Sequence, residues 1–362
     1  MKKKSGSSLS FLSSLFAILV GLLAGLLILL ATNPSQAMEG FFTIVTGAVT
    51  HGAKGIGQVL YYATPLIMTG LSVGFAFQTG LFNIGASGQF IIGAFAAIYV
   101  GLKFPQLGAL HWVVAILAAM VAGFLWGAIP GICKALFNVN EVIACIMTNY
   151  IAMYLVNYLI STDSVLYDKI RNHSKEVLAS AVIPKMGLDR IFAGSSVGGG
   201  FFIALLAVLV IYVILQKTVF GYELKAAGFN KHAARYAGMN ENRNIILSMA
   251  IAGLLAALGG ALLYLAGSGK HITIQDVLAA EGFTGISVAL LGLSHPIGVL
   301  LAGLFIAYIT AGGFYLQLLD FSTEIIDIII AVIIYFSAFS LLVGNLLSRW
   351  QKARQKKGGN AS

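Results

Sequence analysis

The chain has 362 residues, of which 59% are hydrophobic and only 10% charged, and its formal net charge at pH 7 is +9. Soluble domains carry about 25% charged residues, so this composition excludes an ordinary soluble enzyme or binding module. Several apolar runs reach the length of about 20 residues that a helix needs to cross a bilayer, which predicts an all-α polytopic membrane protein.

The apolar runs divide the chain into about ten membrane crossings. The eighth is too short to span alone, and Ser294-His295-Pro296 separates it from the ninth, so these two could form one broken element. The first run exceeds the apolar core of a signal peptide, which favours a retained span over cleavage near Ser35-Gln36-Ala37. The expected spans are 9–31, 57–78, 82–101, 109–132, 142–161, 199–215, 244–266, 282–294, 297–313 and 325–347.

Positive charge is distributed unevenly, and short loops rich in Lys and Arg face the cytoplasm. With a cytoplasmic N-terminus, 14 of the 22 Lys and Arg residues lie inside: three in 1–8, Lys134, five in 216–243 and five in 348–362. Only three lie in short outer loops, and the other five lie in 162–198, which is long enough to escape the rule. The charge therefore reflects topology and anionic lipids rather than a nucleic-acid partner, and 162–198 is the expected extracellular loop.

Residues 70–97 read GLSVGFAFQTGLFNIGASGQFIIGAFAA, and within them residues 77–89 concentrate glycine, amide and hydroxyl groups between apolar runs. Irregular backbone at membrane depth occurs only where protein buries it or where it faces a watery cavity, and broken helices mark transport sites. Two interpretations stay open: this segment lines a translocation pathway, or it is a tight turn of small residues. The candidate pathway residues are Phe82, Asn83, Ser87 and Gln89.

The expected span 142–161 has a polar and aromatic side. Asn149 and Asn157 lie eight residues apart, and the candidate pathway residues Tyr150 and Tyr154 recur with Tyr158 every four residues. Helical geometry places these side chains on adjacent ridges of one side, which should face the bundle or a cavity because lipid offers amides no partner. Rings and amides suit a neutral polar solute with a flat aromatic base. The alternative is hydrogen bonding and ring packing between helices.

Residues 221–240 read GYELKAAGFNKHAARYAGMN and form a polar segment between two apolar runs. Local rules predict a short helix between Asn230, as its N-cap, and Gly238, as its left-handed stop. Phe229 is expected to pack on Ala234 as a hydrophobic staple. So short a helix is marginal alone, and its small-residue surface flanked by charge favours docking on another protein over lying on lipid headgroups.

Four stretches resemble one family, the permeases of ABC importers for simple sugars, branched-chain amino acids and nucleosides, over about residues 50–345. Residues 221–240 are similar to the coupling loop with which such permeases dock on their ATPase subunit. The other three are 70–97, NEVIACIMTNYIAMYLVNYL at 140–159 and EGFTGISVALLGLSHPIGVLLAGLFIA at 281–307. The likeness is strongest to the permeases of bacterial purine-nucleoside importers.

This resemblance implies one transmembrane domain over 1–362, with a type II-like permease fold of about ten helices in the bacterial plasma membrane. The implied partners are a cytoplasmic ATP-binding cassette ATPase, a second related permease subunit and an external substrate-binding lipoprotein. The implied solute is a purine nucleoside such as guanosine. The residues expected to couple to the ATPase are Glu223, Ala227, Gly228, Asn230, Ala233, Ala234, Arg235 and Gly238.

Motifs for catalysis are missing from the chain. Gly267-Ser268-Gly269-Lys270 lacks the upstream glycine of a GxxxxGK(S/T) phosphate loop, so ATP hydrolysis is assigned to a partner chain and this chain is expected to be no enzyme. Cys133 and Cys145 form no CxxC pair and the six histidines are scattered, so neither a metal nor a cofactor is expected.

Two other functions stay open. The same machinery could carry a simple sugar or a branched-chain amino acid, although no span holds an obvious cation for a carboxylate. An ion-coupled secondary transporter would need an acidic relay within the membrane, for which Asp327 gives little support.

Overall fold

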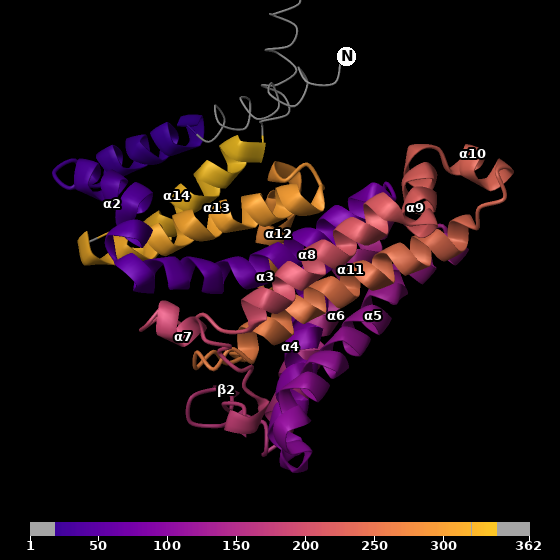
Figure 1. Cartoon of the computed structure of the whole chain (residues 1–362), viewed down its shortest axis with the longest axis horizontal. Helices are drawn as coiled ribbons and strands as arrows, with labels where there is room; N and C mark the ends of the chain where they lie inside the picture. Colours follow the sequence, from indigo (N-terminus) through magenta and orange to yellow (C-terminus); the bar gives the residue numbers. More distant parts are fainter. Residues whose placement is uncertain (1–18, 320, 339–362) are drawn as a thin grey trace, which may run out of the picture. The chain divides into compact units, whose positions relative to one another are not determined.

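The computed structural model describes residues 19–319 and 321–338, and α-helices make up most of them (Figure 1). Seven of the described helices are long and apolar enough to cross a membrane, which confirms the predicted fold class. They are α3 (Gly52–Gln78), α4 (Ala86–Lys103), α5 (His111–Phe137, preceded by the 3-10 helix η1, Pro105–Leu110), α6 (Glu141–Thr162), α8 (Gly200–Lys217), α11 (Glu241–Tyr264) and α13 (Pro296–Tyr315, followed by the 3-10 helix η3, Leu316–Leu319).

Shorter elements connect these helices. Three apolar helices of the described part are shorter than a full span: Leu19–Thr32, α2 (Ala37–Thr50) and α12 (Ala280–Leu291). The helix α14 (Thr323–Ala338) reaches the end of the described residues. The remaining elements are the antiparallel pair β1 (Tyr167–Asp168) and β2 (His173–Ser174), with η2 (Ala179–Ala181), α7 (Leu188–Ile191), α9 (Val219–Phe229) and α10 (Lys231–Tyr236).

Most expected spans coincide with a helix to within a few residues. The span expected from residue 82 begins only at Ala86, because the chain makes a turn before it. The helices α12 and α13 are separate rather than one broken element, since Leu293 and Ser294 both adopt φ of +54° and Pro296 opens α13. Residues 37–50, for which no span was expected, form α2.

Some expectations fall outside the described residues. These are residues 9–18 of the first span, 339–347 of the last span, and the two terminal segments 1–8 and 348–362.

The described residues form two compact units, and each is considered by itself. Unit 1 combines the residues up to Thr50 with those from Tyr308 onward. Its interior contains Leu29 and Ile44, and the Tyr308 hydroxyl donates a hydrogen bond to the backbone carbonyl of Val45 in α2. Because a hydroxyl that is shielded from water needs a hydrogen-bond partner, this bond ties α2 to the start of the C-terminal part of the unit.

Unit 2 (His51–Ala307) is built around α3 and α11, which are mostly buried, whereas α5 and α8 are largely exposed. Glycines bring α5 directly against α11: a Cβ atom added to Gly127 would lie 2.5 Å from the carbonyl oxygen of Met249 and 2.8 Å from the Cα of Gly253. Small residues permit such close backbone approach between membrane helices. The exposed apolar faces of α5 and α8 therefore belong to the side of this unit that meets lipid or another chain.

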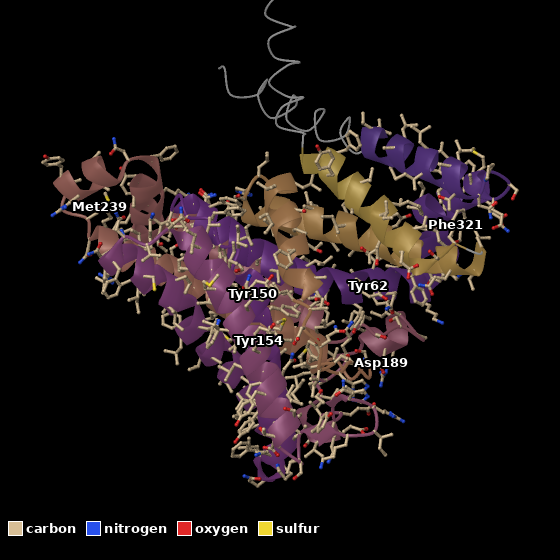
Figure 2. All side chains as sticks on the ribbon, turned by 180° about the vertical axis from the view of Figure 1, so that it is seen from behind. Tyr62, Tyr150, Tyr154, Asp189, Met239 and Phe321 are labelled. Carbon is tan, nitrogen blue, oxygen red and sulfur yellow. The ribbon has the colours of Figure 1, made fainter. Side chains whose placement is uncertain are left out.

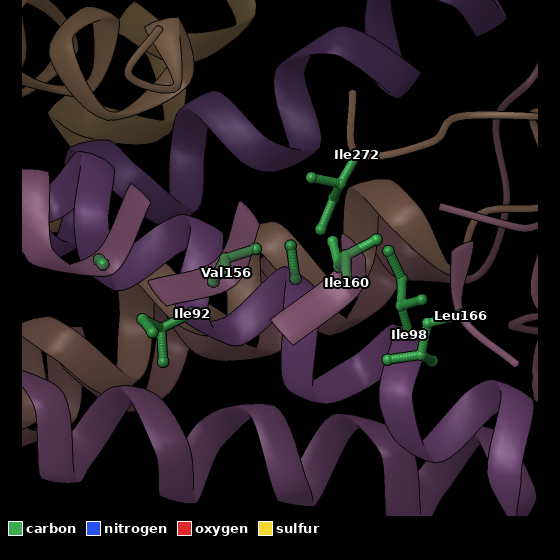
Figure 3. Packing of buried hydrophobic residues seen from close by; sticks show 8 residues of the cluster. Ile92, Ile98, Val156, Ile160, Leu166 and Ile272 are labelled. Carbon is green, nitrogen blue, oxygen red and sulfur yellow. The ribbon is translucent and has the colours of Figure 1, made fainter. Parts of the chain in front are cut away.

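A hydrophobic cluster fixes α6 against α4 (Figure 3). It contains Ile98 from α4, Val156 and Ile160 from α6, and Leu166 and Ile272 from the connecting segments, all of them almost fully buried. Within a bilayer such packing stabilises the helix pair through close van der Waals contact rather than through transfer out of water. One face of α6 is thereby committed to the interior, and only the opposite face remains open.

The α9–α10 segment, defined as residues 219–240, and the β1–β2 hairpin lie at opposite ends of the long helices of unit 2 (Figure 1). The hairpin also holds the connection between α11 and α12. The backbone N–H of Ser174 donates to the carbonyl of Ile272 (2.9 Å), and that of Ile274 donates to the carbonyl of Asn172 (3.1 Å). The expected loop 162–198 is thus pinned to a segment about a hundred residues later in the chain.

Candidate functional site

The α9–α10 segment contains the short helix that local rules predicted. The Asn230 side chain accepts a hydrogen bond from the N–H of Ala233 (3.1 Å) and so caps the start of α10, and Gly238 follows its end with φ of +83°. A glycine in this left-handed conformation avoids the steric penalty of a Cβ atom. The predicted cap and stop are both confirmed.

The predicted staple is wrong. The Phe229 side chain is 92% exposed, which excludes packing on Ala234, and Ala234 is itself only 4% exposed. Tyr236 is 94% exposed, so the accessible surface presents two large aromatic rings in addition to small residues. The spacing of seven residues between the two rings, in a polar segment, was the sequence signal that could have identified them.

The other expected coupling residues are distributed over both sides of this segment. Asn230, Ala233, Arg235, Gly228 and Gly238 are exposed, whereas Glu223 and Ala227 are half-buried. Ala234 is buried, so it supports the exposed surface of this segment rather than forming part of it.

Gly228 places the α9–α10 segment against the turn at the end of α3. A Cβ atom at Gly228 would lie 2.5 Å from the carbonyl oxygen of Gln78 and 2.9 Å from the amide nitrogen of Gly80. These are backbone atoms, so a side chain at position 228 has no room. The two backbones are therefore in direct contact.

The polar residues that follow this turn are paired with one another. Asn83 donates from Nδ2 to the Gln89 Oε1 (2.8 Å) and to the Ser72 hydroxyl (3.1 Å), and Gln89 donates from Nε2 to the Asn83 Oδ1 (3.1 Å). All three side chains are buried. Buried amides with satisfied donors and acceptors hold a backbone in one conformation, whereas an unpaired amide would be costly. This pair therefore fixes the irregular backbone before α4.

Asn149 and Ser87 tie the same region to α6 and α12. The Asn149 Oδ1 accepts from the N–H of Gly88 (2.8 Å) and its Nδ2 donates to the carbonyl of Ile84 (3.0 Å), and the side chain is 1% exposed. The Ser87 hydroxyl donates to the carbonyl of Ala279, the residue before α12 (2.8 Å). Asn149 thus supplies the partners that the start of α4 would otherwise lack.

The tyrosines of α6 lie on its open face. Tyr150 is 46% exposed and Tyr154 is 55% exposed, and Figure 2 shows both along the middle of the long helices, far from Met239 in the α9–α10 segment. Asn149 does not share this face, so the expectation that amides and rings line one surface is only half right. Spacings of four and eight residues predict which side chains lie on neighbouring ridges of a helix. They do not predict the boundary between its buried side and its open side.

The remaining two candidate pathway residues, Asn157 and Phe82, lie on different elements. Asn157 is half-buried and donates to the carbonyl of Gln275 (3.0 Å) in the connection between α11 and α12. Phe82 is half-buried and stacks on Phe77, with ring centroids 5.2 Å apart. Rings and amides in such a setting bind flat, uncharged solutes by stacking and hydrogen bonding. No group of three or more metal-binding side chains occurs among the described residues.

Charged groups gather at the hairpin end. Hydrogen bonding to the Lys103 ammonium lowers the pKa of Asp163, which follows α6. The rings of His173 and His271 stack in parallel, with centroids 4.1 Å apart. Burial, and secondly the neighbouring His173, lower the pKa of His271. Ile170, at the tip of the hairpin, is 95% exposed.

Comparison with known proteins gives relatives over nearly the whole chain. The guanosine ABC transporter permease protein NupP of Bacillus subtilis is 39% identical over 347 residues, which cover 96% of this chain and 97% of the relative. The nucleoside ABC transporter permease protein NupB of Lactococcus lactis is 35% identical over 358 residues, with the same coverage. The glucose ABC transporter permease protein TsgB13 of Haloferax volcanii is 33% identical over 288 residues, which cover 78% of this chain and 75% of the relative.

The first two organisms each contain a further permease protein that resembles this chain. NupQ of Bacillus subtilis is 29% identical over 70% of this chain, and NupC of Lactococcus lactis is 26% identical over 71% of it. No solved structure matches the chain. A family model described as the permease component of branched-chain amino acid transport systems matches residues 55–338, so the chain belongs to that permease family.

Proposed function

We propose that this chain is the membrane-spanning subunit of an ABC importer that carries nucleosides, in particular purine nucleosides, into the cell. The observation that carries the proposal is near-full-length identity of 39% and 35% to permease proteins named for guanosine and nucleosides. The α9–α10 segment and the open face of α6 give this activity a physical basis.

The α9–α10 segment is the dock for a separate ATP-binding cassette ATPase. Aromatic rings that are exposed in the free subunit and buried on assembly dominate the energetics of many interfaces, and Phe229 and Tyr236 meet this description. Arg235 beside them offers a charge for a partner carboxylate. In this assignment the segment lies in the cytoplasm, as its excess of Lys and Arg indicates, and the hairpin end faces the external lipoprotein that delivers the solute.

The open face of α6 is one wall of the translocation pathway. A wall that is exposed in the isolated chain needs a second wall, which supports pairing with a related permease subunit, as the existence of NupQ beside NupP also does. Tyr150 and Tyr154 would contact the solute, and Asn157 would offer its amide oxygen, because its nitrogen already donates to the carbonyl of Gln275. Phe82, whose ring stacks on Phe77, would be a further aromatic contact. Asn83, Ser87, Gln89 and Asn149 would instead hold the wall in place, because their polar groups are already paired.

The chemistry of this face suits a nucleoside better than an amino acid. Residues 143–158 include no Lys, Arg, Asp or Glu, so a zwitterion would lose its hydration without gaining a counter-charge. A nucleobase stacks on aromatic rings, and amides hydrogen-bond its edges and the ribose hydroxyls. The face would hold such a solute weakly, as a transporter requires.

Reconstitution tests the proposal. The chain is purified with its ATPase, the second permease and the lipoprotein encoded beside it, and uptake of labelled guanosine into proteoliposomes is followed with and without ATP. Uptake should require ATP, compete with unlabelled inosine, and resist excess ribose or leucine. Uptake that follows a pH gradient without ATP would indicate a secondary transporter, and competition by ribose or leucine alone would change the substrate class.

A further inference from the structure

We propose that Gln78 is a positioning residue that passes movement of the α9–α10 segment to the short helix α12 and so couples ATP hydrolysis to opening of the pathway. This inference rests on the proposed function and concerns how the two parts of the subunit communicate. It is carried by three contacts of the Gln78–Gly80 turn, each of which leads to a different element.

The first contact joins the turn to the α9–α10 segment. Gly228 lies so close that an added Cβ atom would be 2.5 Å from the Gln78 carbonyl oxygen and 2.9 Å from the Gly80 amide nitrogen. No side chain lies between the two backbones to absorb a displacement. Packed protein has low compressibility, so a push on the segment reaches the turn directly.

The second contact leads from the turn to the far end of α12. The Gln78 Nε2 donates a hydrogen bond to the carbonyl of Ser294 (2.9 Å), 216 residues later in the chain. Ser294 and Leu293 both have φ of +54°, which places two residues with side chains in the left-handed region. Such a conformation persists only where its surroundings hold it, and the Gln78 amide is one of the groups that hold it.

The third contact stabilises the turn itself. The Thr79 hydroxyl hydrogen-bonds with the Ser248 hydroxyl of α11, and both side chains are buried. This bond anchors the turn on α11, which is mostly buried, so that the Gln78 side chain keeps a defined direction. The turn therefore acts as a fixed junction between the segment and α12.

The other end of α12 is attached to the same region of the chain. Ser87 donates to the carbonyl of Ala279, and a Cβ atom at Gly282 would overlap the Ser87 backbone. The segment just before it is held against α6 by Asn157, through the carbonyl of Gln275. Thus α12 is held beyond its end by Gln78 and at its start by Ser87, and the segment that leads into it is bonded to Asn157 of α6.

Gln58 provides a matched control on the same helix. It lies in α3 as Gln78 does, and its side chain is also bonded to a distant backbone group. Its Oε1 accepts a hydrogen bond from the N–H of Ser196 (3.4 Å). It is near the opposite end of α3 from the Gln78–Gly80 turn that meets the α9–α10 segment. Changes caused merely by losing a glutamine from α3 should therefore appear in Gln58→Leu as well.

The experiment measures how much nucleoside is imported per ATP hydrolysed, in the complete complex. Gln78→Glu keeps the size of the side chain but removes the donor, and Gln78→Leu removes all polarity. Both should co-purify with the ATPase and retain basal hydrolysis, while imported guanosine per ATP falls about 5-fold or more, the lower range of coupling between sites. Gln58→Leu should keep the wild-type ratio.

A second readout covers variants that assemble poorly. Hydrogen exchange of residues 289–296 should change in the wild-type complex when a non-hydrolysable ATP analogue is added, and this change should disappear in Gln78→Glu. A wild-type ratio in both Gln78 variants, an equal loss in Gln58→Leu, or an unaltered exchange response would each overturn the inference. Failure of the wild-type complex to import with ATP would instead overturn the proposed function.

Discussion

Replacing Gly228 by alanine should loosen the α9–α10 segment from the rest of unit 2. The added Cβ atom would lie 2.5 Å from the Gln78 carbonyl oxygen, whereas ordinary contacts begin at 3.4 Å, so the two backbones must separate by about 1 Å. Overpacking of this kind costs about 1–3 kcal/mol, and neither atom can rotate away because both belong to the main chain. A penalty of this size raises the population of the detached segment about 5- to 150-fold.

Hydrogen exchange of residues 219–240 in the purified complex measures that population, because exchange through local opening reports its equilibrium constant. Stimulation of ATP hydrolysis by the loaded lipoprotein should fall in parallel. Gly200→Ala is the control, since its Cβ atom would meet Leu262 only at 3.6 Å. Unchanged exchange and unchanged stimulation in Gly228→Ala would refute the reasoning that the backbones are in rigid contact.

Three further predictions address other parts of the molecule. Asn149→Leu should lower the free energy of unfolding in detergent by about 1–3 kcal/mol for each of the two backbone groups that it leaves unpaired; an unchanged melting curve would show that these bonds contribute nothing. Tyr154→Ala should leave melting unchanged but reduce guanosine uptake through the loss of about 1–3 kcal/mol of base stacking, whereas Leu206→Ala on α8 should not. The folded hairpin end holds the pKa of His271 below its ordinary value of about 6.5, so the folded hairpin should be most stable above that pH. This stability should fall as the pH drops from about 6.5 through the lowered pKa of His271. Hydrogen exchange of residues 167–174 would detect the fall, and His271→Phe would abolish this pH dependence.

The course of the helices was largely readable from sequence because a bilayer imposes a fixed length on apolar segments. The cap and stop of α10 were readable for a similar reason, since Asn230 and Gly238 act on their immediate neighbours. The helix α2 was not found, because its burial depends on contacts with residues beyond 308, which leave no local pattern in 37–50.

Side-chain direction was harder to predict than position. The exposure of Phe229 was not predicted, and the neighbouring contact of Gly228 with the Gln78–Gly80 turn joins residues about 150 positions apart and leaves no local pattern. The pairing of Asn83 with Gln89 was likewise hidden, because a turn rather than a helix brings them together. The sequence singles out the polar residues of the membrane segments, but composition does not distinguish those that meet a solute from those that satisfy backbone.

The glycine contact between α5 and α11 limits where movement can occur. Because main chain touches main chain along this pair, sliding or tilting either helix against the other would need the glycines to pass over protruding carbonyls. We therefore expect α5 and α11 to move as one rigid unit. The rearrangement that admits and releases the solute would then take place in the helices around them.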